Sequence, residues 1–320
     1  MALQKTMKYF YSVVLILTFS TVYAQHTNFN SQRNWSLNKK EIMFGFGATQ
    51  FLGDLGGLDK IGTDYSLADI DWRSTGVGGM LGYRYRFHPY WATTTSLNIG
   101  LLKGDDALTN EIIRNSRNLH FRSIIIELHQ RLEIIVFANE KLGNRYNLSR
   151  HSKKMGDHNS QFYLFGGVGI SYFNPKAELN GKWVKLRPLS TEGQGLPDGP
   201  KKTLPVTLTI PFGLGYKWGL NRMWRMGIEA TYVKTFSDYI DDVHGSYYDS
   251  DFLAANVGTE AEYLSNPSGE NSAWFASGQQ RGDDEKDAYF YLNITFYRNI
   301  TYKDYAKQRK MNKWKGRYKF

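Results

Sequence analysis

The side chains best suited to chemistry are acids that follow segments of alternating polar and apolar residues. Asp238, Asp241 and Asp242 lie close together, and His244 comes directly after them. Carboxylates beside a histidine can activate water for hydrolysis, and carboxylate oxygens are also the ligands that calcium prefers. Further acids in comparable positions are Asp249, Asp251, Asp54, Asp105 and Asp106.

A structural role competes with both chemistries. The run "SDYIDD", residues 237–242, has the composition of a turn in which acids cap backbone N–H groups. We favour this role, and calcium binding and hydrolysis remain as alternatives. The chain has no cysteine, which excludes disulfides, thiolate metal sites and a cysteine nucleophile. The glycine-rich run at 164–173 precedes no helical pattern, so it is not a nucleotide-binding loop. We expect no cofactor and no enzymatic activity.

A second set of charged residues lies within the alternating segments rather than after them. His129 stands between Glu127 and Arg131 on the polar face of one segment. A histidine in such a position is more often part of a buried ionic network than a metal ligand or a base. We therefore predict an ionic network among Arg84, Arg122, Glu127, His129, Arg131, Lys217, Arg225 and Glu229.

The segments that carry these charges have the period of β-strands. In "VTLTIPFGLGYKW", residues 206–218, every second residue is apolar or aromatic. This contrasts with the polar chain as a whole, whose mean hydropathy is -0.49. Alternation of this kind indicates a strand with one apolar face. It predicts eight strands, near 41–53, 75–87, 91–103, 119–136, 161–173, 205–218, 224–237 and 288–299.

Such strands fit a soluble sandwich or barrel with the apolar face inward, or a transmembrane barrel with that face outward. Charges deep in the polar faces favour the membrane barrel, because they would pair inside a narrow eight-stranded barrel. Aromatic residues at the strand ends resemble the girdle at a bilayer interface. Connections at 88–91 and 219–223 are short, whereas those near 54–74, 104–118, 174–204 and 238–287 are long.

We therefore predict an all-β protein: an eight-stranded antiparallel outer-membrane β-barrel with long outer loops and its apolar face on outer-membrane lipid. The connection near 137–160 is an exception, because it is long and basic on the side where turns are expected to be short.

The N-terminus has the three parts of a secretory signal. Lys5 and Lys8 precede the apolar run at 10–19, and "VYA" ends just before Gln25. We expect cleavage after Ala24. The predicted organisation is a signal peptide at 1–24, a periplasmic segment at 25–40, the barrel at 41–299 and a basic periplasmic tail at 300–320.

The formal net charge of +10 comes mainly from this tail, which holds about +7. An exported chain rarely meets nucleic acid, so we expect no nucleic-acid partner. Anionic lipid headgroups or an acidic periplasmic protein fit better, although a freely solvated tail is an equal alternative. The candidate partner surface comprises Lys307, Arg309, Lys310, Lys313, Trp314, Lys315 and Arg317.

Two stretches carry a more specific signal, "YLFGGVGISYFNPKAELNGKWVKLRPLSTEGQG" (163–195) and "IPFGLGYKWGLNRMWRMGIEATYVKTFSDYIDDVHGSYYD" (210–249). They resemble the PorG family, outer-membrane barrels of the type IX secretion system of Bacteroidetes. "GATQFLGDLGG" (47–57) and "GYRYRFHPYWA" (82–92) fit the same family. The resemblance covers roughly residues 40–250 and the last strand.

The resemblance implies a non-enzymatic component of a machine that exports proteins such as gliding adhesins. Members of the family are associated with a periplasmic ring made of PorK or GldK and PorN or GldN. The implied role is to tether or position that ring at the outer membrane. The alternatives are a small-solute barrel and a protease at the barrel rim.

Overall fold

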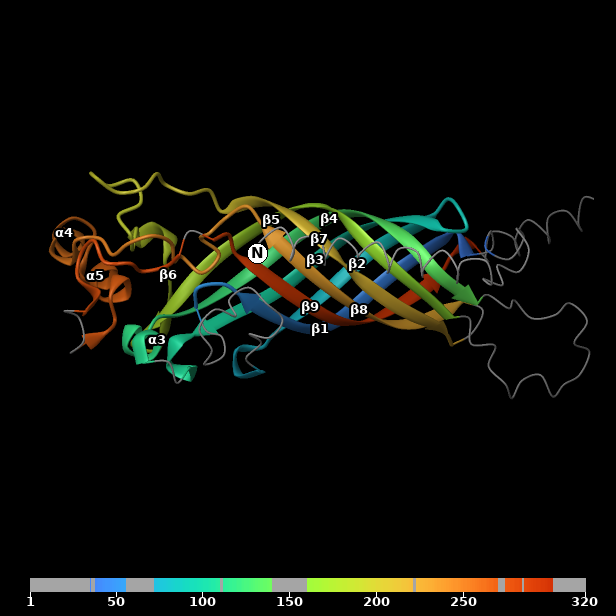
Figure 1. The fold of residues 1–320 in the computed structure, drawn as a ribbon, viewed down its shortest axis with the longest axis horizontal. Helices are drawn as coiled ribbons and strands as arrows, with labels where there is room; N and C mark the ends of the chain where they lie inside the picture. Colours follow the sequence, from blue (N-terminus) through green and yellow to red (C-terminus); the bar gives the residue numbers. More distant parts are fainter. Residues whose placement is uncertain are drawn as a thin grey trace, which may run out of the picture.

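The structure is a computed structural model that describes residues 35, 38–55, 72–109, 112–139, 160–220, 223–269, 274–283 and 285–301. Neighbouring strands pair antiparallel, and β1 pairs with both β2 and β9, while β4 pairs with β5. These pairings close an eight-stranded barrel (Figure 1). The eight barrel strands are β1 (Lys40–Leu52), β2 (Gly76–Arg86), β3 (Trp91–Asp105), β4 (His120–Asn139), β5 (Ser160–Leu179), β7 (Val206–Gly219), β8 (Trp224–Thr235) and β9 (Ala288–Asn299). The ninth strand, β6 (Lys182–Lys185), pairs with the end of β5 outside the barrel.

The apolar faces of the strands point outward, as the sequence predicts. In β7, Leu208 is 62% exposed, whereas Thr207, Thr209 and Lys217 are buried. A soluble barrel would show the reverse pattern, because it would bury its apolar face. An apolar exterior around a polar, filled interior is the organisation of outer-membrane barrels. The fold prediction is therefore confirmed.

One end of the barrel carries an elaborate cap built from the long connections (Figure 1). A cluster of apolar side chains from the strands and the loops closes this end, including Phe51, Phe121, Phe173, Ile240 and Val243. The short elements of the cap are η3 (Trp72–Ser74), η4 (Asp106–Leu108), α3 (Ile112–Arg117), η6 (Arg187–Leu189), α4 (Ser250–Asn256) and α5 (Thr259–Ser265).

The connection after β5 differs from the prediction. Strand β5 runs on to Leu179 instead of ending near 173, and it forms a hairpin with β6. Asn180 and Gly181 form the tight turn, and both adopt positive φ angles, of 52° and 78°. Asparagine and glycine tolerate this left-handed conformation, which favours a two-residue hairpin loop. The predicted 174–204 loop is therefore partly a strand extension beyond the barrel wall.

Several predicted segments lie wholly or largely outside the described residues: the signal peptide, the periplasmic segment at 25–40, most of the connections near 54–74 and 137–160, and the basic tail, including its candidate partner surface. Within the described residues, no helix has the length and apolar character needed to cross a membrane.

Candidate functional site

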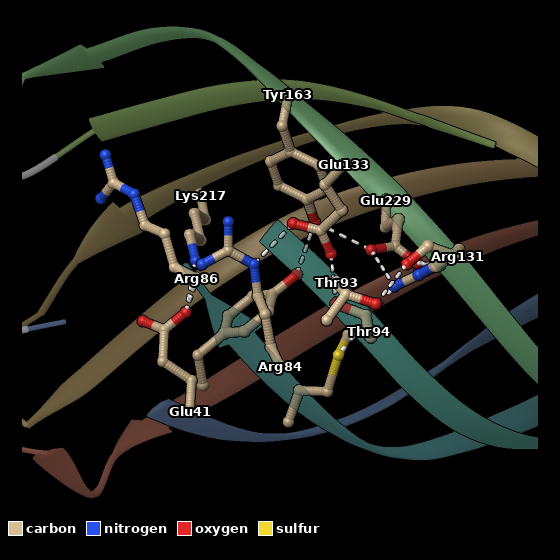
Figure 2. A network of polar contacts seen from close by, with 12 residues as sticks. Glu41, Arg84, Arg86, Thr93, Thr94, Arg131, Glu133, Tyr163, Lys217 and Glu229 are labelled. Atoms are coloured by element: carbon tan, nitrogen blue, oxygen red, sulfur yellow. Dashed lines mark hydrogen bonds and ion pairs between the residues drawn. The ribbon is translucent and has the colours of Figure 1, made fainter. Parts of the chain in front are cut away.

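The barrel interior holds a network of buried ion pairs centred on Glu41 (Figure 2). The Glu41 carboxylate lies 2.6 Å from Lys217 Nζ and 2.9 Å from Arg84 Nη1, and Arg225 Nη1 is 3.3 Å away. Strands β1, β2, β7 and β8 each supply one of these side chains. One carboxylate therefore contacts three cationic side chains across the lumen.

A second part of the network lies beside the first. Arg84 also bonds Glu133 at 2.5 Å. Arg131 forms a bidentate salt bridge with Glu229, at 2.6 and 2.9 Å. The Tyr163 hydroxyl donates to the same carboxylate at 2.8 Å. Figure 2 shows how these side chains converge from several strands. They tie opposite walls of the barrel together.

A third group surrounds Glu127. Its carboxylate accepts hydrogen bonds from Ser171, at 3.0 Å, and from Tyr289. His129 Nε2 lies 3.1 Å from the same side chain, and the other ring nitrogen contacts Asn98 at 3.0 Å. Both ring nitrogens thus face polar neighbours. Because His129 is only 1% exposed, the structure places it in a buried polar cluster.

Two glycines make room for these large interior groups. A Cβ on Gly215 would lie 2.2 Å from the Tyr163 ring, and one on Gly169 would lie 2.4 Å from His129. Contacts this short do not occur, so only glycine fits at these positions without moving the network.

Arg122 was predicted to belong to this network, and the structure contradicts that prediction. It is an even-numbered residue of β4, whereas the inward residues Glu127 and Arg131 are odd-numbered, so the pleat turns Arg122 outward. Its guanidinium stacks over Trp183 of β6, 3.6 Å from the ring centroid. The other predicted members are buried in the lumen: Arg84, Glu127, His129, Arg131, Lys217, Arg225 and Glu229.

The predicted ionic network omitted three interior charges, namely Glu41, Glu133 and Arg86, all buried. Glu133 lies on the same strand face as Arg131, and Arg86 lies on the same strand face as Arg84. The alternation of apolar and polar residues could therefore have placed them in the lumen. Glu41 was missed because it opens its strand and resembles a terminal residue.

The acids near the outer rim are part of the cap. Asp238 contacts His244 Nδ1, and Asp242 accepts a 2.6 Å bond from Thr191. Asp241 accepts the Val243 N–H at 3.0 Å. The remaining acids have local roles: Asp249 and Asp105 cap short helices, Asp106 binds Arg117, and Asp251 is exposed in α4.

Two buried arginines join the connections of the cap to one another. Arg281 binds Glu192 at 2.9 Å and the Asp242 carbonyl at 2.7 Å. Arg117 pairs with Asp106 and donates to the Asp54 and Arg281 carbonyls, at 2.8 and 2.6 Å. These contacts join connections that are far apart in the sequence. They show that the segment around Glu192 packs against the connection between β8 and β9.

Several cap carboxyls have raised pKa values. Burial, reinforced by the nearby charge of Asp283, raises the pKa of Asp54 to about 8. Burial also raises the pKa of Glu192 to about 7 and that of Asp242 to about 6, against the opposing influence of Arg281. Burial raises the pKa of Asp241 well above its ordinary value, and the charge of Asp287 adds to this.

These shifts predict that the cap loosens as the pH rises. Each of these carboxyls has a higher pKa in the folded cap than in the unfolded chain. At pH values between these two pKa values the folded cap binds more protons, so its stability falls as the pH rises. The stabilisation that Asp54 contributes is fully present below its ordinary pKa of 3.8 and is lost as the pH rises past about 8.

We expect limited proteolysis of the outer loops to be slower at pH 5 than at pH 9, with cleavage of an unstructured peptide as the control for protease activity. Equal protection at both pH values after this correction would contradict the prediction.

The chemistry available at the rim is limited. The Asp238–His244 pair resembles an oriented base, with the His244 side chain 27% exposed. In the part of the chain that the structure describes, no group of three or more His, Asp or Glu side chains is arranged to hold a metal ion.

Comparison with known proteins assigns the chain to no family. No protein-family profile and no curated protein matches the chain. Similar solved structures include Ail of Yersinia pestis with a heparin analogue, at 10% identity and TM-score 0.35, covering 81% of this chain and 97% of that chain. Neisserial surface protein A has 5% sequence identity and a TM-score of 0.34, and the match covers 82% of this chain and 97% of that chain. OprG of Pseudomonas aeruginosa, at 10% and 0.32, covers 81% and 96%.

Proposed function

We propose that this chain is a non-enzymatic outer-membrane component of the type IX protein secretion system, which tethers or positions the periplasmic ring complex. Its partners would be ring proteins of the PorK or GldK and PorN or GldN kinds, together with outer-membrane lipid. The resemblance of residues 163–195 and 210–249 to the PorG family supports this function.

The observation that carries the proposal is that the barrel is both filled and closed. Large charged side chains occupy the lumen, and an apolar cluster closes the outer end. A barrel whose lumen is occupied by large side chains suits an anchor better than an open channel. The tether would then contact its partner at the periplasmic end.

The basic tail is the part of the sequence best suited to that contact. Removing residues 303–320 is expected to weaken recovery of the ring proteins at low salt. Because salt screens exposed charges, recovery by the full-length chain should also fall as the salt concentration rises, and the difference between the two proteins should shrink. The truncation keeps Thr301, whose hydroxyl accepts the Lys40 N–H at 2.7 Å. Unchanged recovery at low salt would contradict this role of the tail.

The small-solute barrel is tested by conductance in planar bilayers. Because ion pairs such as Arg131–Glu229 span the lumen, the reconstituted protein is expected to give no stable single-channel steps. A variant with Arg84, Arg131 and Glu229 all replaced by alanine should conduct if it inserts and folds. Steady conductance of the unmodified protein would favour the solute barrel.

The Asp238–His244 pair keeps a rim protease as a second candidate. That function requires the purified barrel to cleave peptides and requires His244→Ala to abolish the cleavage. We expect no cleavage by either protein, because the pair already has a structural role beside the buried Tyr239 ring, 5.2 Å away.

A further inference from the structure

One polar patch interrupts the apolar exterior of the barrel. Thr95 and Gln130 are exposed side chains on the outward faces of β3 and β4. Gln130 donates to Thr93 at 2.6 Å and accepts a bond from Thr95. A polar patch that faces hydrocarbon is unfavourable unless its groups are satisfied. The hydrogen bonds among these three side chains satisfy most of their polar groups.

Beside this patch lies a shallow groove of about 510 Å³, lined by Lys40, Tyr83, Tyr85, Thr93 and Thr95. The strand register places Tyr85 between Lys40 and Thr93, and places Tyr83 opposite Thr95. The groove therefore crosses three neighbouring strands, β1 to β3. It lies toward the end with the short 88–91 turn, which is the periplasmic end in outer-membrane barrels.

Within the described residues, the Tyr83 and Tyr85 hydroxyls and the exposed Lys40 ammonium of the groove have no side-chain partner. The ammonium can only donate hydrogen bonds, and the hydroxyls can donate as well as accept. No carboxylate lines the groove. A complementary ligand therefore carries negative charge and many acceptor oxygens. The phosphodiester and ester groups of a phospholipid have this character.

The surface next to the groove suits the acyl chains of the same ligand. One step along the strands, the register aligns Phe44, Leu81, Leu97 and Leu128 across β1 to β4. All four are exposed, by 40% to 58%. From the periplasmic end inward, the row of lysine and tyrosine side chains is followed by a row of apolar side chains. A phospholipid has the same order, with its headgroup followed by its acyl chains.

We propose that this groove is a binding site for one phospholipid of the periplasmic leaflet, with its phosphate at Lys40 and its ester region at Tyr83 and Tyr85. The site does not depend on the proposed secretion function. It would fix the rotation and depth of the barrel in the membrane, because interfacial lysine and tyrosine side chains act as anchors.

Native mass spectrometry of the detergent-solubilised full chain tests the site, with phosphatidylglycerol and with a diacylglycerol of the same chains as probes. The unmodified protein is expected to retain one phosphatidylglycerol and much less diacylglycerol. Lys40→Gln should weaken retention about fivefold, from the attraction of a single lysine for anionic lipid. Tyr83→Phe with Tyr85→Phe should also weaken it. The matched control is Lys103→Gln, which changes an exposed lysine at the far end of β3.

Equal retention of the two lipids, or equal retention by the Lys40→Gln and Lys103→Gln variants, would overturn the site. Folding of each variant is checked by its heat-dependent shift on a gel. As a second measurement, a photo-crosslinking residue in place of Tyr83 is expected to label phospholipid in cells. Labelling of a protein at this position instead would show a lateral protein contact and would also overturn the proposal.

Discussion

Replacing Glu41 by glutamine is expected to lower the free energy of unfolding of the barrel by about 3–5 kcal/mol, the usual cost of removing one partner of a buried ion pair. Glu41 is completely buried, and its carboxylate contacts Lys217, Arg84 and Arg225. Arg84 keeps a second partner in Glu133, but Lys217 has no comparable carboxylate contact left. The amide keeps the shape and removes the charge, so the loss is electrostatic. Urea unfolding in lipid vesicles measures it.

The matched control is Glu260→Gln, which makes the same change at an exposed position of α5. Surface changes of this kind usually alter stability by less than about 0.5 kcal/mol. A second variant, Glu41→Gln with Lys217→Met, removes the cation together with its partner and is expected to recover part of the loss. If Glu41→Gln unfolds at the same urea concentration as the unmodified protein, the interior network does not stabilise the barrel.

Replacing Arg281 by methionine is expected to release the outer cap while the barrel stays folded. The guanidinium is buried and binds Glu192, the Asp242 carbonyl and, at 3.3 Å, the Ser265 carbonyl. Its removal takes a donor away from each of these acceptors, although Glu192 keeps the His244 N–H at 2.7 Å. A loss of about 3 kcal/mol in a locally opening unit corresponds to a rise in cleavage rate on the order of a hundredfold.

Limited proteolysis of the outer loops measures this release, and the heat-dependent gel shift reports the state of the barrel. Lys201→Gln provides the control, because Lys201 is an exposed cation in the same cap. Global unfolding of Arg281→Met would mean that the cap and the barrel form one cooperative unit. Unchanged protection of the loops would mean that Arg281 does not hold the cap.

Much of the barrel could be predicted because strand alternation is a local property. The apolar positions of β7 reveal both the strand and its lipid-facing side without any knowledge of its neighbours. Arg122 was nevertheless placed wrongly: its charge suggested the lumen, whereas its parity relative to Glu127 in the same strand places it outside. A consistent count of parity along β4 would have corrected the prediction.

The cap could not be predicted in the same way. The Arg281–Glu192 pair joins residues 89 positions apart, and Arg117 donates to Arg281 across 164 positions. Neither pair leaves a periodic signal in the sequence, because loop geometry decides which charges meet. The extension of β5 into a hairpin with β6 was missed for a related reason. The proline and glycine residues of this segment suggested irregular structure, and the turn signal at Asn180–Gly181 was read as part of a loop.

The most direct test of the tether is cross-linking of intact cells, followed by purification of this protein from the solubilised outer membrane and identification of the proteins recovered with it. We expect the periplasmic ring proteins to be recovered, and a barrel-folded variant without residues 303–320 to recover less of them. A parallel purification through a ring protein serves as the positive control. Recovery of the barrel alone, in an experiment where that control succeeds, would contradict the proposed function.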